Sequence, residues 1–395
     1  MTISIRTRLS WALAAVLIQA TLIFSSCRHE NRNQDAGSYA APDSMIYMPE
    51  NASGFTIEGW KGRRSVLLTV NTPWQGADST GETASSLLIV RGGEEIPRGY
   101  QGAVIHDEAR HIIAMSSTHI AMLEALGEID RIAGVSGRRF VTSQALASRG
   151  EEVADVGYDG NIDYETLAGA MPDLVLLYGV AGPSSMEGKL RELGLPYIYI
   201  SDYLEEHPLG KAEWAVALGE IVGRREMARR VYDSIPDRYH ALAQMVREQV
   251  KDHPRVMLNT PYGGSWWMPP SDSYMVRLIT DAGGEYMYRS KILRQSTPID
   301  LEEATTMVDN ADYWLNPGSI TSLESLCSQL PRLADAPCVK AGAVWNNNRR
   351  STPGGGNDFF ESGIMHPDII LSDLIHIFHP ELMEGYEPQY YTRLP

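Results

Sequence analysis

Residues that could recognise a small molecule gather in short polar and aromatic segments, each of which directly follows an apolar run. The first half of the chain supplies Ser117, Thr118, His119, Arg138, Arg139, Tyr158, Tyr178 and Tyr203, and the second half supplies Tyr262, Trp266, Trp267, Asn347 and Arg349. Aromatic rings offer a large contact area at small entropic cost, and arginine pairs with carboxylate or catecholate oxygens. Any one of these residues alone would suit an ordinary surface. Their shared position predicts a binding site for a bulky, anionic complex.

A reaction centre is not apparent in the sequence. It contains no G-x-S-x-G nucleophile elbow and no phosphate-cradling G-x-x-x-x-G-K-[ST]. The run Thr352-Pro353-Gly354-Gly355-Gly356 lacks the lysine and is more typical of a flexible loop. We therefore expect neither catalytic residues nor a cofactor of the protein's own.

Ten histidines raise the question of a metal site. His376 and His379 could share one face of a helix, but that helix is apolar and ends at His379-Pro380. Packing and an interaction with the helix dipole explain the two residues better than metal binding does. His119 would lie at the carboxyl edge of a sheet, where it could touch a ligand. We expect no metal site.

The N-terminus has the pattern of an export signal. Arg6 and Arg8 precede an apolar run over residues 11–24, which is shorter than the ~20 residues of a membrane-spanning helix. Ser25-Ser26-Cys27 then resembles a lipobox, whose cysteine becomes the acylated first residue of the mature protein. We expect a signal peptide over 1–27, a lipid on Cys27 and a polar tether over 28–53. The alternative is an ordinary signal peptide with an incidental cysteine.

Charge and cysteine content narrow the function further. The formal net charge of −16 argues against binding nucleic acid, whose phosphates need a basic surface. Apart from Cys27, the cysteines are Cys327 and Cys338. An exported protein could join these two in a disulfide, but two buried thiols explain them equally well.

The remaining pattern predicts the elements that would position the site. Residues 54–105 are β-rich, and residues 106–208 and 254–395 each alternate short strands with helices. Residues 209–253 read as one long helix in which only Pro236 could cause a kink or a break. The predicted fold is therefore α/β, with two Rossmann-like lobes, a long backbone helix between them and an extra β-rich segment. Loops at the carboxyl ends of parallel strands would form the ligand-facing rim.

Four stretches give the chain a family resemblance over roughly residues 106–381. They are 111–135 with its serine loop and Ala-Leu-Gly helix end, 156–175 with Val-Gly, Asn-x-Asp and Met-Pro-Asp-Leu-Val, 299–302, and the closing 366–381 helix. They resemble the helical-backbone (class III) substrate-binding proteins of ABC importers for iron–siderophore complexes, heme and vitamin B12. The β-rich segment 54–105 and the long loop 346–361 depart from that family and could reshape the mouth of a cleft.

The resemblance implies a monomeric, non-catalytic binding protein, lipid-anchored in the periplasm, that delivers a ferric siderophore to the permease. Glu165 and Glu302 match the two family glutamates that dock onto arginines of the permease subunits. Cobalamin or heme is the near alternative, favoured if Trp266, Trp267 and Tyr158 stack on a macrocycle. A surface lipoprotein that is an enzyme or an adhesin, with residues 54–105 as its working part, is the alternative from another class.

Overall fold

The computed structural model describes residues 39–77, 84–158, 160–180, 182–292 and 295–395. The predicted signal peptide, with Cys27, lies outside the described residues, as does the tether as far as residue 38. The chain divides into two units, and the described part of the smaller one is 39–41 with 96–101. The larger unit, described below, comprises residues 42–95 and 102–395. Within the described residues, no helix is both long enough and apolar enough to cross a membrane.

A five-stranded sheet opens the larger unit. Its strands, in spatial as well as chain order, are β1 (Ser44–Tyr47), β2 (Phe55–Gly59), β3 (Val66–Val70), β4 (Ser85–Val90) and β5 (Ala103–His106). Neighbours pair antiparallel except β4 and β5, which pair parallel. The strand β1 lies within the segment predicted to be a polar tether. That prediction was wrong there because the edge of β2 gives residues 44–47 a pairing partner, which composition alone does not reveal.

Lobe one is a parallel sheet covered by short helices, as predicted. The strand order is β12 (Tyr197–Tyr199), β11 (Leu174–Leu177), β6 (Ile112–Ala114), β7 (Ile132–Val135) and β8 (Ala154–Asp155). The helices are α2 (Ser117–Ala125), α3 (Gln144–Ser148), α4 (Tyr164–Gly169) and α5 (Glu187–Leu193), and a small hairpin joins β9 (Gly157–Tyr158) to β10 (Asn161–Ile162). Every residue of β11 is buried, as expected for a strand with helices on both faces.

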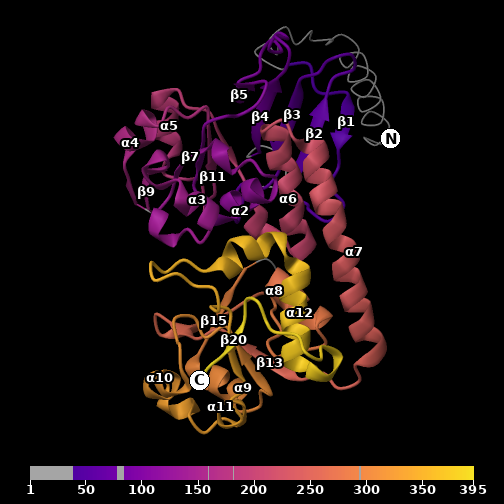
Figure 1. Cartoon of the computed structure of the whole chain (residues 1–395), viewed down its shortest axis with the longest axis vertical. Helices are drawn as coiled ribbons and strands as arrows, with labels where there is room; N and C mark the ends of the chain where they lie inside the picture. The colour runs from indigo at the N-terminus through magenta and orange to yellow at the C-terminus, as the bar shows by residue number, and fades with distance from the viewer. Residues whose placement is uncertain (1–38, 78–83, 159, 181, 293–294) are drawn as a thin grey trace, which may run out of the picture. The chain divides into compact units, whose positions relative to one another are not determined.

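Two helices, rather than one, connect the lobes. They are α6 (Pro208–Ile221) and α7 (Arg225–Gln249), and the chain breaks between them instead of at Pro236, which lies inside α7. The predicted single helix was wrong because Gly223 has a φ of +72°, the left-handed conformation in which a glycine commonly ends a helix, here α6. Figure 1 shows α7 running from lobe one to lobe two. The long connecting helix is therefore α7, and α6 packs against it.

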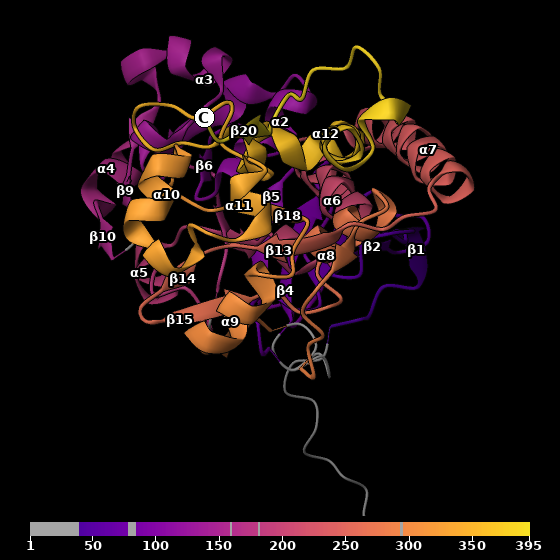
Figure 2. The ribbon, with the colours of Figure 1, turned by 90° about the horizontal axis from the view of Figure 1, so that it is seen from below.

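Lobe two repeats the α/β plan. Its sheet has the order β16 (Glu285–Tyr286), β13 (Arg255–Leu258), β18 (Tyr313–Leu315), β19 (Val344–Asn346) and β20 (Thr392–Arg393), with only β20 antiparallel to its neighbour. A second sheet holds β14 (Pro261–Tyr262), β15 (Ser265–Met268) and β17 (Thr297–Ile299). The helices are α8 (Tyr274–Asp281), α9 (Leu301–Val308), α10 (Leu323–Gln329), α11 (Pro337–Lys340) and α12 (Pro367–Phe378). Figure 2 shows α12 beside α7, with which it is in contact.

The N-terminal sheet packs on lobe one instead of reaching away from it. Strand β4 contacts β12, and the backbone of Trp74 bridges that of Gly179. Ser201 donates a hydrogen bond to the carbonyl of Pro73 at 3.0 Å. Glu213 of α6 accepts hydrogen bonds from the backbone of the segment just after β1. The β-rich segment is thus a fixed part of lobe one.

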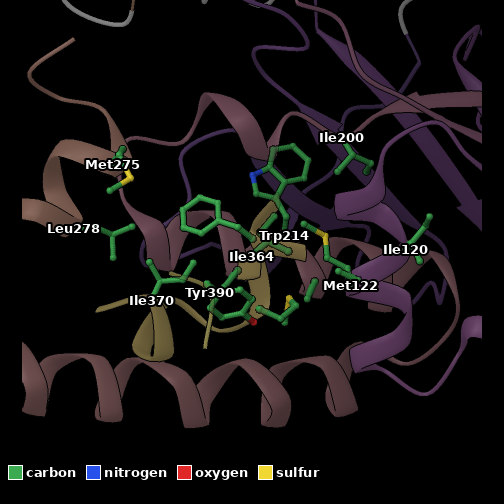
Figure 3. Packing of buried hydrophobic residues seen from close by; sticks show 14 of the residues in the cluster. Ile120, Met122, Ile200, Trp214, Met275, Leu278, Ile364, Ile370 and Tyr390 are labelled. Carbon is green, nitrogen blue, oxygen red and sulfur yellow. The ribbon is translucent and has the colours of Figure 1, made fainter. Parts of the chain in front are cut away.

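A single hydrophobic core joins the two lobes. Figure 3 shows Trp214 of α6 among side chains from lobe one, such as Met122, and from lobe two, such as Met275 and Tyr390. Trp214 is fully buried, and its indole N–H donates to Glu205 at 2.8 Å. Because interiors pack at crystal-like density, a shared core opposes large movement of one lobe against the other.

The two cysteines of lobe two are free thiols. Cys338 is buried in α11, and its Sγ lies 3.9 Å from the carbonyl oxygen of Val308. Of the two alternatives that the sequence left open, the structure therefore has unbridged thiols and not the Cys327–Cys338 disulfide.

Candidate ligand-binding cleft

A cavity of about 1410 Å³ lies where the N-terminal sheet, the end of lobe one and lobe two meet. The N-terminal part supplies residues 53–54, 72 and 75–77, lobe one supplies 201 and 203–206, and lobe two supplies the rest. Its volume exceeds the ~300–1,000 Å³ that is usual for drug-sized ligands. The cavity is therefore suited to a large ligand, and the β-rich segment forms part of its wall.

Three neighbouring strands of lobe two present asparagines to this cavity. Asn259, Asn316 and Asn347 directly follow β13, β18 and β19, whose carboxyl ends meet at one edge of the sheet. Asn259 and Asn316 have φ values of +66° and +57°, a left-handed conformation that asparagine tolerates better than most residues. The predicted rim therefore exists in lobe two, and amides dominate it.

Two of the cavity's asparagines have a buried oxygen without a partner. The Oδ1 atoms of Asn316 and Asn348 are inaccessible to solvent and accept no hydrogen bond within the described part of the chain. Asn259 differs, since its Nδ2 donates to the carbonyl of Trp267 at 3.0 Å. A buried acceptor left unsatisfied costs free energy, and because neither oxygen is exposed to the cavity, a ligand could reach it only after the amide side chain had turned.

Aromatic side chains form the apolar part of the lining. They are Tyr203 of lobe one and Trp267, Tyr274, Phe359 and Phe360 of lobe two. Trp267 is 44% exposed, whereas Trp266 on the same strand is buried and donates its indole N–H to the carbonyl of Leu258 at 2.8 Å. Successive residues of a strand point to opposite faces, so only one tryptophan of the pair can reach the cavity.

The charged residues of the lining are all acidic. They are Glu205, Glu206 and Asp272, and none of the lining residues that the structure describes is a lysine, an arginine or a histidine. Glu205 is buried and accepts hydrogen bonds from the backbone N–H groups of Ser53 and Gly54 at 2.9 and 3.0 Å. Its role is to hold the N-terminal segment. Among the described lining residues, an anionic ligand would therefore meet carboxylates and no cationic side chain.

The hydroxyl groups of the two tyrosines in the lining are difficult to deprotonate. Burial raises the pKa of Tyr203 to about 12 and that of Tyr274 to about 12. The Tyr203 hydroxyl also donates to the carbonyl of Gly179 and accepts from the backbone N–H of Gln75. Ligation of ferric iron by tyrosine needs the deprotonated oxygen, which these environments disfavour.

The three predicted arginines do not line the cavity. A guanidinium nitrogen of Arg138 donates to the carbonyl of Val153. Arg139 lies over the ring of Phe140, with its Cζ 4.4 Å from the centroid. Arg349 is directed toward Glu387. These arginines were predicted as ligand residues because they lie in loops that follow strands. In the structure, each side chain contacts a neighbouring residue of the protein outside the cavity.

The predicted serine, threonine and histidine of α2 are not part of the cavity's lining. Ser117 donates to the carbonyl of Phe360 at 3.3 Å, and Thr118 donates to Asp202 at 3.1 Å. His119 is completely buried, and desolvation lowers its pKa to about 3. The prediction that His119 lies at the ligand-facing edge was wrong, because that helix position points into the core.

Four predicted aromatic residues also lie outside the lining. Tyr158 packs on Phe140 with centroids 4.7 Å apart, Tyr178 packs against the core, Trp266 is buried, and Tyr262 is 82% exposed. Of the thirteen predicted ligand residues, Tyr203, Trp267 and Asn347 line the cavity, and their contact with a ligand stays a prediction. A macrocycle in this cavity could not stack on Trp266, which is buried, and Tyr158, although 49% exposed, does not belong to the lining.

Sequence reasoning missed most of the polar lining. Asn259, Asn316 and Asn348 each lie in or beside a segment recognised as following a strand, so a search for amides there would have found them. Tyr274 and Phe359 carried no such signal. Tyr274 begins α8, and Phe359 belongs to the 3-10 helix η6 (Asp358–Phe360), which the long loop 346–361 carries to the cavity.

The long loop of lobe two reaches across to lobe one. Glu361 accepts hydrogen bonds from the backbone N–H groups of Thr142 and Ser143 at 2.8 and 2.7 Å. Asp358 accepts one from the Thr142 hydroxyl at 2.9 Å. Burial raises the pKa of Glu361 to about 7, although these hydrogen bonds oppose the shift. The loop thus closes one side of the cleft through contacts that titrate near neutral pH.

The two predicted docking glutamates are exposed at the starts of helices in different lobes. Glu165 is in the first turn of α4, which Asp163 caps, and Glu302 is in the first turn of α9, which Asp300 caps. Their docking role stays a prediction.

Among the described residues, no group of three or more His, Cys, Asp or Glu side chains could hold a metal ion. The ring of His376, for which the sequence favoured a packing role, lies 5.9 Å from the ring of Tyr386.

Comparison with known proteins identifies the class. The sequence model of the periplasmic binding protein family matches residues 112–346, more than half of the chain, and the chain belongs to this family. The predicted α/β fold of two lobes is thereby confirmed, as is the resemblance to the siderophore, heme and B12 group. The protein is a substrate-binding component of the ABC-importer class and not an enzyme.

Three relatives illustrate the similarity. An uncharacterized lipoprotein of Methanocaldococcus jannaschii is 23% identical over 374 residues, which are 90% of this chain and 84% of that protein. A periplasmic heme-binding protein from Pseudomonas aeruginosa has a TM-score of 0.56 and 17% identity, covering 73% of this chain and 98% of that one. A periplasmic binding protein from Veillonella parvula has a TM-score of 0.57 and 15% identity, covering 80% and 98%. At such identities the two structures indicate the fold alone.

Proposed function

We propose that this protein captures a large, uncharged metal complex, a corrinoid such as cobalamin, and delivers it to an ABC permease. The observation that carries the proposal is the lining of the 1410 Å³ cavity, which combines amides and aromatic rings with no described cationic side chain. A corrin ring is decorated with amide side chains and presents a broad apolar face. Amides match the Asn259, Asn316 and Asn347 rim, and Trp267 supplies a face for the ring.

Asn316 and Asn348 also belong to the lining, and their amide groups could exchange hydrogen bonds with the primary amides of such a ligand. Heme is disfavoured by the same lining. None of the described lining residues is a lysine or an arginine that could pair with its propionates, and none is a histidine that could ligate its iron. The heme bound by the Pseudomonas protein is therefore not carried over to this chain.

A ferric siderophore, the ligand favoured by the sequence, is the second candidate, but only if the complex is uncharged. A neutral ferric trihydroxamate would tolerate the uncharged lining, whereas an anionic ferric tricatecholate would need the arginines that lie elsewhere. In either case the cobalt or iron belongs to the cargo, and the protein has no cofactor of its own.

The same proposal places the protein in the periplasm as a monomer held at a membrane through a lipid on Cys27. Its support is the lipobox-like Ser25-Ser26-Cys27 and the description of the Methanocaldococcus relative as a lipoprotein. Glu165 and Glu302 would contact the permease, one from each lobe, since both are exposed.

Ligand class is tested by tryptophan quenching and equilibrium dialysis with four probes. We expect cyanocobalamin to bind at least about a hundredfold more tightly than hemin or a ferric tricatecholate, since each uncompensated buried charge costs several kcal/mol. A neutral ferric trihydroxamate is the fourth probe. Tighter binding of hemin or of the tricatecholate than of both neutral complexes would refute the proposal.

Trp267→Ala tests whether the cavity is the binding site. Loss of one stacked indole should weaken binding roughly tenfold to thirtyfold. Tyr262→Ala is the matched control, because Tyr262 lies on the same small sheet but is 82% exposed and outside the lining. Equal effects of the two substitutions would place the ligand elsewhere.

Docking is tested by uptake. Glu165→Ala together with Glu302→Ala should abolish delivery while leaving ligand affinity unchanged. Glu303→Ala, the adjacent exposed carboxylate in the first turn of α9, is the control and should leave uptake intact. Loss of binding in the double variant would contradict the docking role.

A further inference from the structure

A second cavity, of about 570 Å³, lies on the side of lobe one where β1, the start of β3 and the break between α6 and α7 come together. Six arginines line it, namely Arg63, Arg64, Arg91, Arg224, Arg225 and Arg230. The whole chain has a formal net charge of −16, so a cluster of six arginines is unexpected from its overall composition. The ligand-binding cleft and its proposed function do not use this cavity.

Some of these arginines have structural partners and two do not. Arg91 and Arg225 both bind Glu220, at 2.5 and 2.6 Å. By contrast, Arg64 and Arg230 are exposed, and neither side chain forms an ion pair with any described residue. The cavity therefore carries positive charge that the described fold does not neutralise.

The start of α7 faces the same cavity. Arg224 is the N-cap residue of this helix, and no side chain caps the first-turn N–H groups. Arg225 and Met227 of that turn line the cavity, as does Glu226, whose carboxylate lies 3.5 Å from Arg225 and offsets part of the positive charge. The first N–H groups of a 25-residue helix carry partial positive charge and are suited to phosphate oxygens. Guanidinium groups beside them provide the bidentate geometry that phosphates prefer.

Exposed apolar side chains surround the same positive region. Met45, Ile46 and Met48, in or next to the edge strand β1, are 47%, 37% and 58% exposed, and Met227 is 37% exposed. Ile46 and Met227 line the cavity itself. Flexible apolar side chains next to arginines are the combination that binds membrane interfaces, where the former enter the acyl boundary and the latter pair with headgroups.

We infer that this face, the arginine cavity with its methionine rim, docks on an anionic phospholipid bilayer. The chain length supports a bilayer as the partner, because Met45 follows Cys27 by only 18 positions, a reach of at most about 65 Å. The inference rests on the lipid anchor of the proposed function, but not on the ligand. Docking would hold the protein in one orientation on the membrane instead of leaving it to swing on its tether.

The native methionines report the docking directly. The full-length lipoprotein is reconstituted into vesicles of phosphatidylcholine, with or without phosphatidylglycerol, and treated briefly with hydrogen peroxide. Mass spectrometry then measures the oxidation of each methionine. We expect Met45, Met48 and Met227 to oxidise roughly fivefold more slowly on the anionic vesicles, and this protection to disappear in high salt.

Internal and matched controls make the result specific. Met171, which is 75% exposed, follows α4 on the opposite side of lobe one from β1 and α7, and it should oxidise equally on both vesicles (Figures 1 and 2). Arg64→Gln with Arg230→Gln should remove the protection of the rim. Arg289→Gln with Arg332→Gln, which removes the same charge from exposed positions of lobe two, should retain it.

Several outcomes would overturn the inference. Equal oxidation of the rim on both kinds of vesicle would exclude an electrostatic bilayer contact, and so would protection that survives Arg64→Gln with Arg230→Gln. Protection by inorganic phosphate on phosphatidylcholine vesicles would assign the cavity to a soluble phosphate compound instead. Cobalamin binding, measured on the same samples, distinguishes these outcomes from a failure of the proposed ligand.

Discussion

Replacement of Glu213 by glutamine tests how the N-terminal sheet is held beside the cleft. Glu213 is fully buried in α6, and its carboxylate accepts four hydrogen bonds. The Tyr47 hydroxyl and the N–H of Glu50 reach Oε1 at 2.6 and 2.8 Å, and the N–H groups of Asn51 and Ala52 reach Oε2 at 2.7 Å each. Neither a lysine nor an arginine of the described chain pairs with it, so these donors alone stabilise the charge.

The geometry sets the size of the effect. Glutamine keeps one acceptor oxygen and turns the other into an NH₂ donor, which would face two N–H or O–H donors. Each buried donor left without an acceptor costs about 1–3 kcal/mol, so Glu213→Gln should destabilise the protein by about 4 kcal/mol. At the entropy of unfolding of a chain this long, that corresponds to a Tm lowered by about 5 °C.

Thermal unfolding, hydrogen exchange and ligand titration together test this reasoning. Amides of residues 50–52 should exchange faster in Glu213→Gln, and affinity should fall because the adjoining Ser53 and Gly54 line the cavity. Tyr47→Phe removes one donor without adding another, so it should cost only about 1 kcal/mol. A Tm of Glu213→Gln equal to that of the wild type, or a larger loss in Tyr47→Phe, would refute the account.

Three further predictions follow from individual residues. Burial raises the pKa of Glu361 from 4.5 to about 7, so the folded protein keeps a proton that the unfolded chain loses in that window. Stability should therefore fall by roughly 3 kcal/mol as pH rises from about 4.5 to 7, and Glu361→Gln should flatten this dependence in urea titrations. Alkylation of unreduced, unfolded protein should label both Cys327 and Cys338, whereas a disulfide would leave both unlabelled. At Asn316, where φ is +57°, substitution by alanine should cost about 1 kcal/mol in chemical unfolding. Asn316→Gly should keep that stability yet weaken ligand binding, and equal affinity in this variant would exclude contact of the Asn316 amide with the ligand.

Elements with strong local signals could be recognised in the sequence. The closing helix within residues 366–381 is α12, which Pro367 begins, and the 299–302 stretch contains Asp300, which caps α9. The break at Gly223 was missed because glycine and proline both interrupt helices, and only the packing of α6 on α7 selects which one does.

The candidate site was harder to predict because its residues depend on which neighbours they meet. Arg139 follows a strand as expected, yet Phe140 holds its guanidinium away from the cavity. Trp266 and Trp267 are indistinguishable by composition, and strand register alone buries one and exposes the other. A side chain's role in binding is thus a long-range property, even where its loop can be predicted locally.

The sequence by itself determined the family, the α/β alternation and the surplus of acidic residues, since motifs, periodicity and composition are local properties that survive without a fold. Only the tertiary structure decided the character of the cleft. Long-range packing set the predicted arginines elsewhere, brought amides from β13, β18 and β19 to one edge, and added the N-terminal sheet as a wall. The ligand that we propose is neutral, whereas the sequence favoured an anionic one, because charge acts over the few ångströms between neighbours and the fold determines which residues are neighbours.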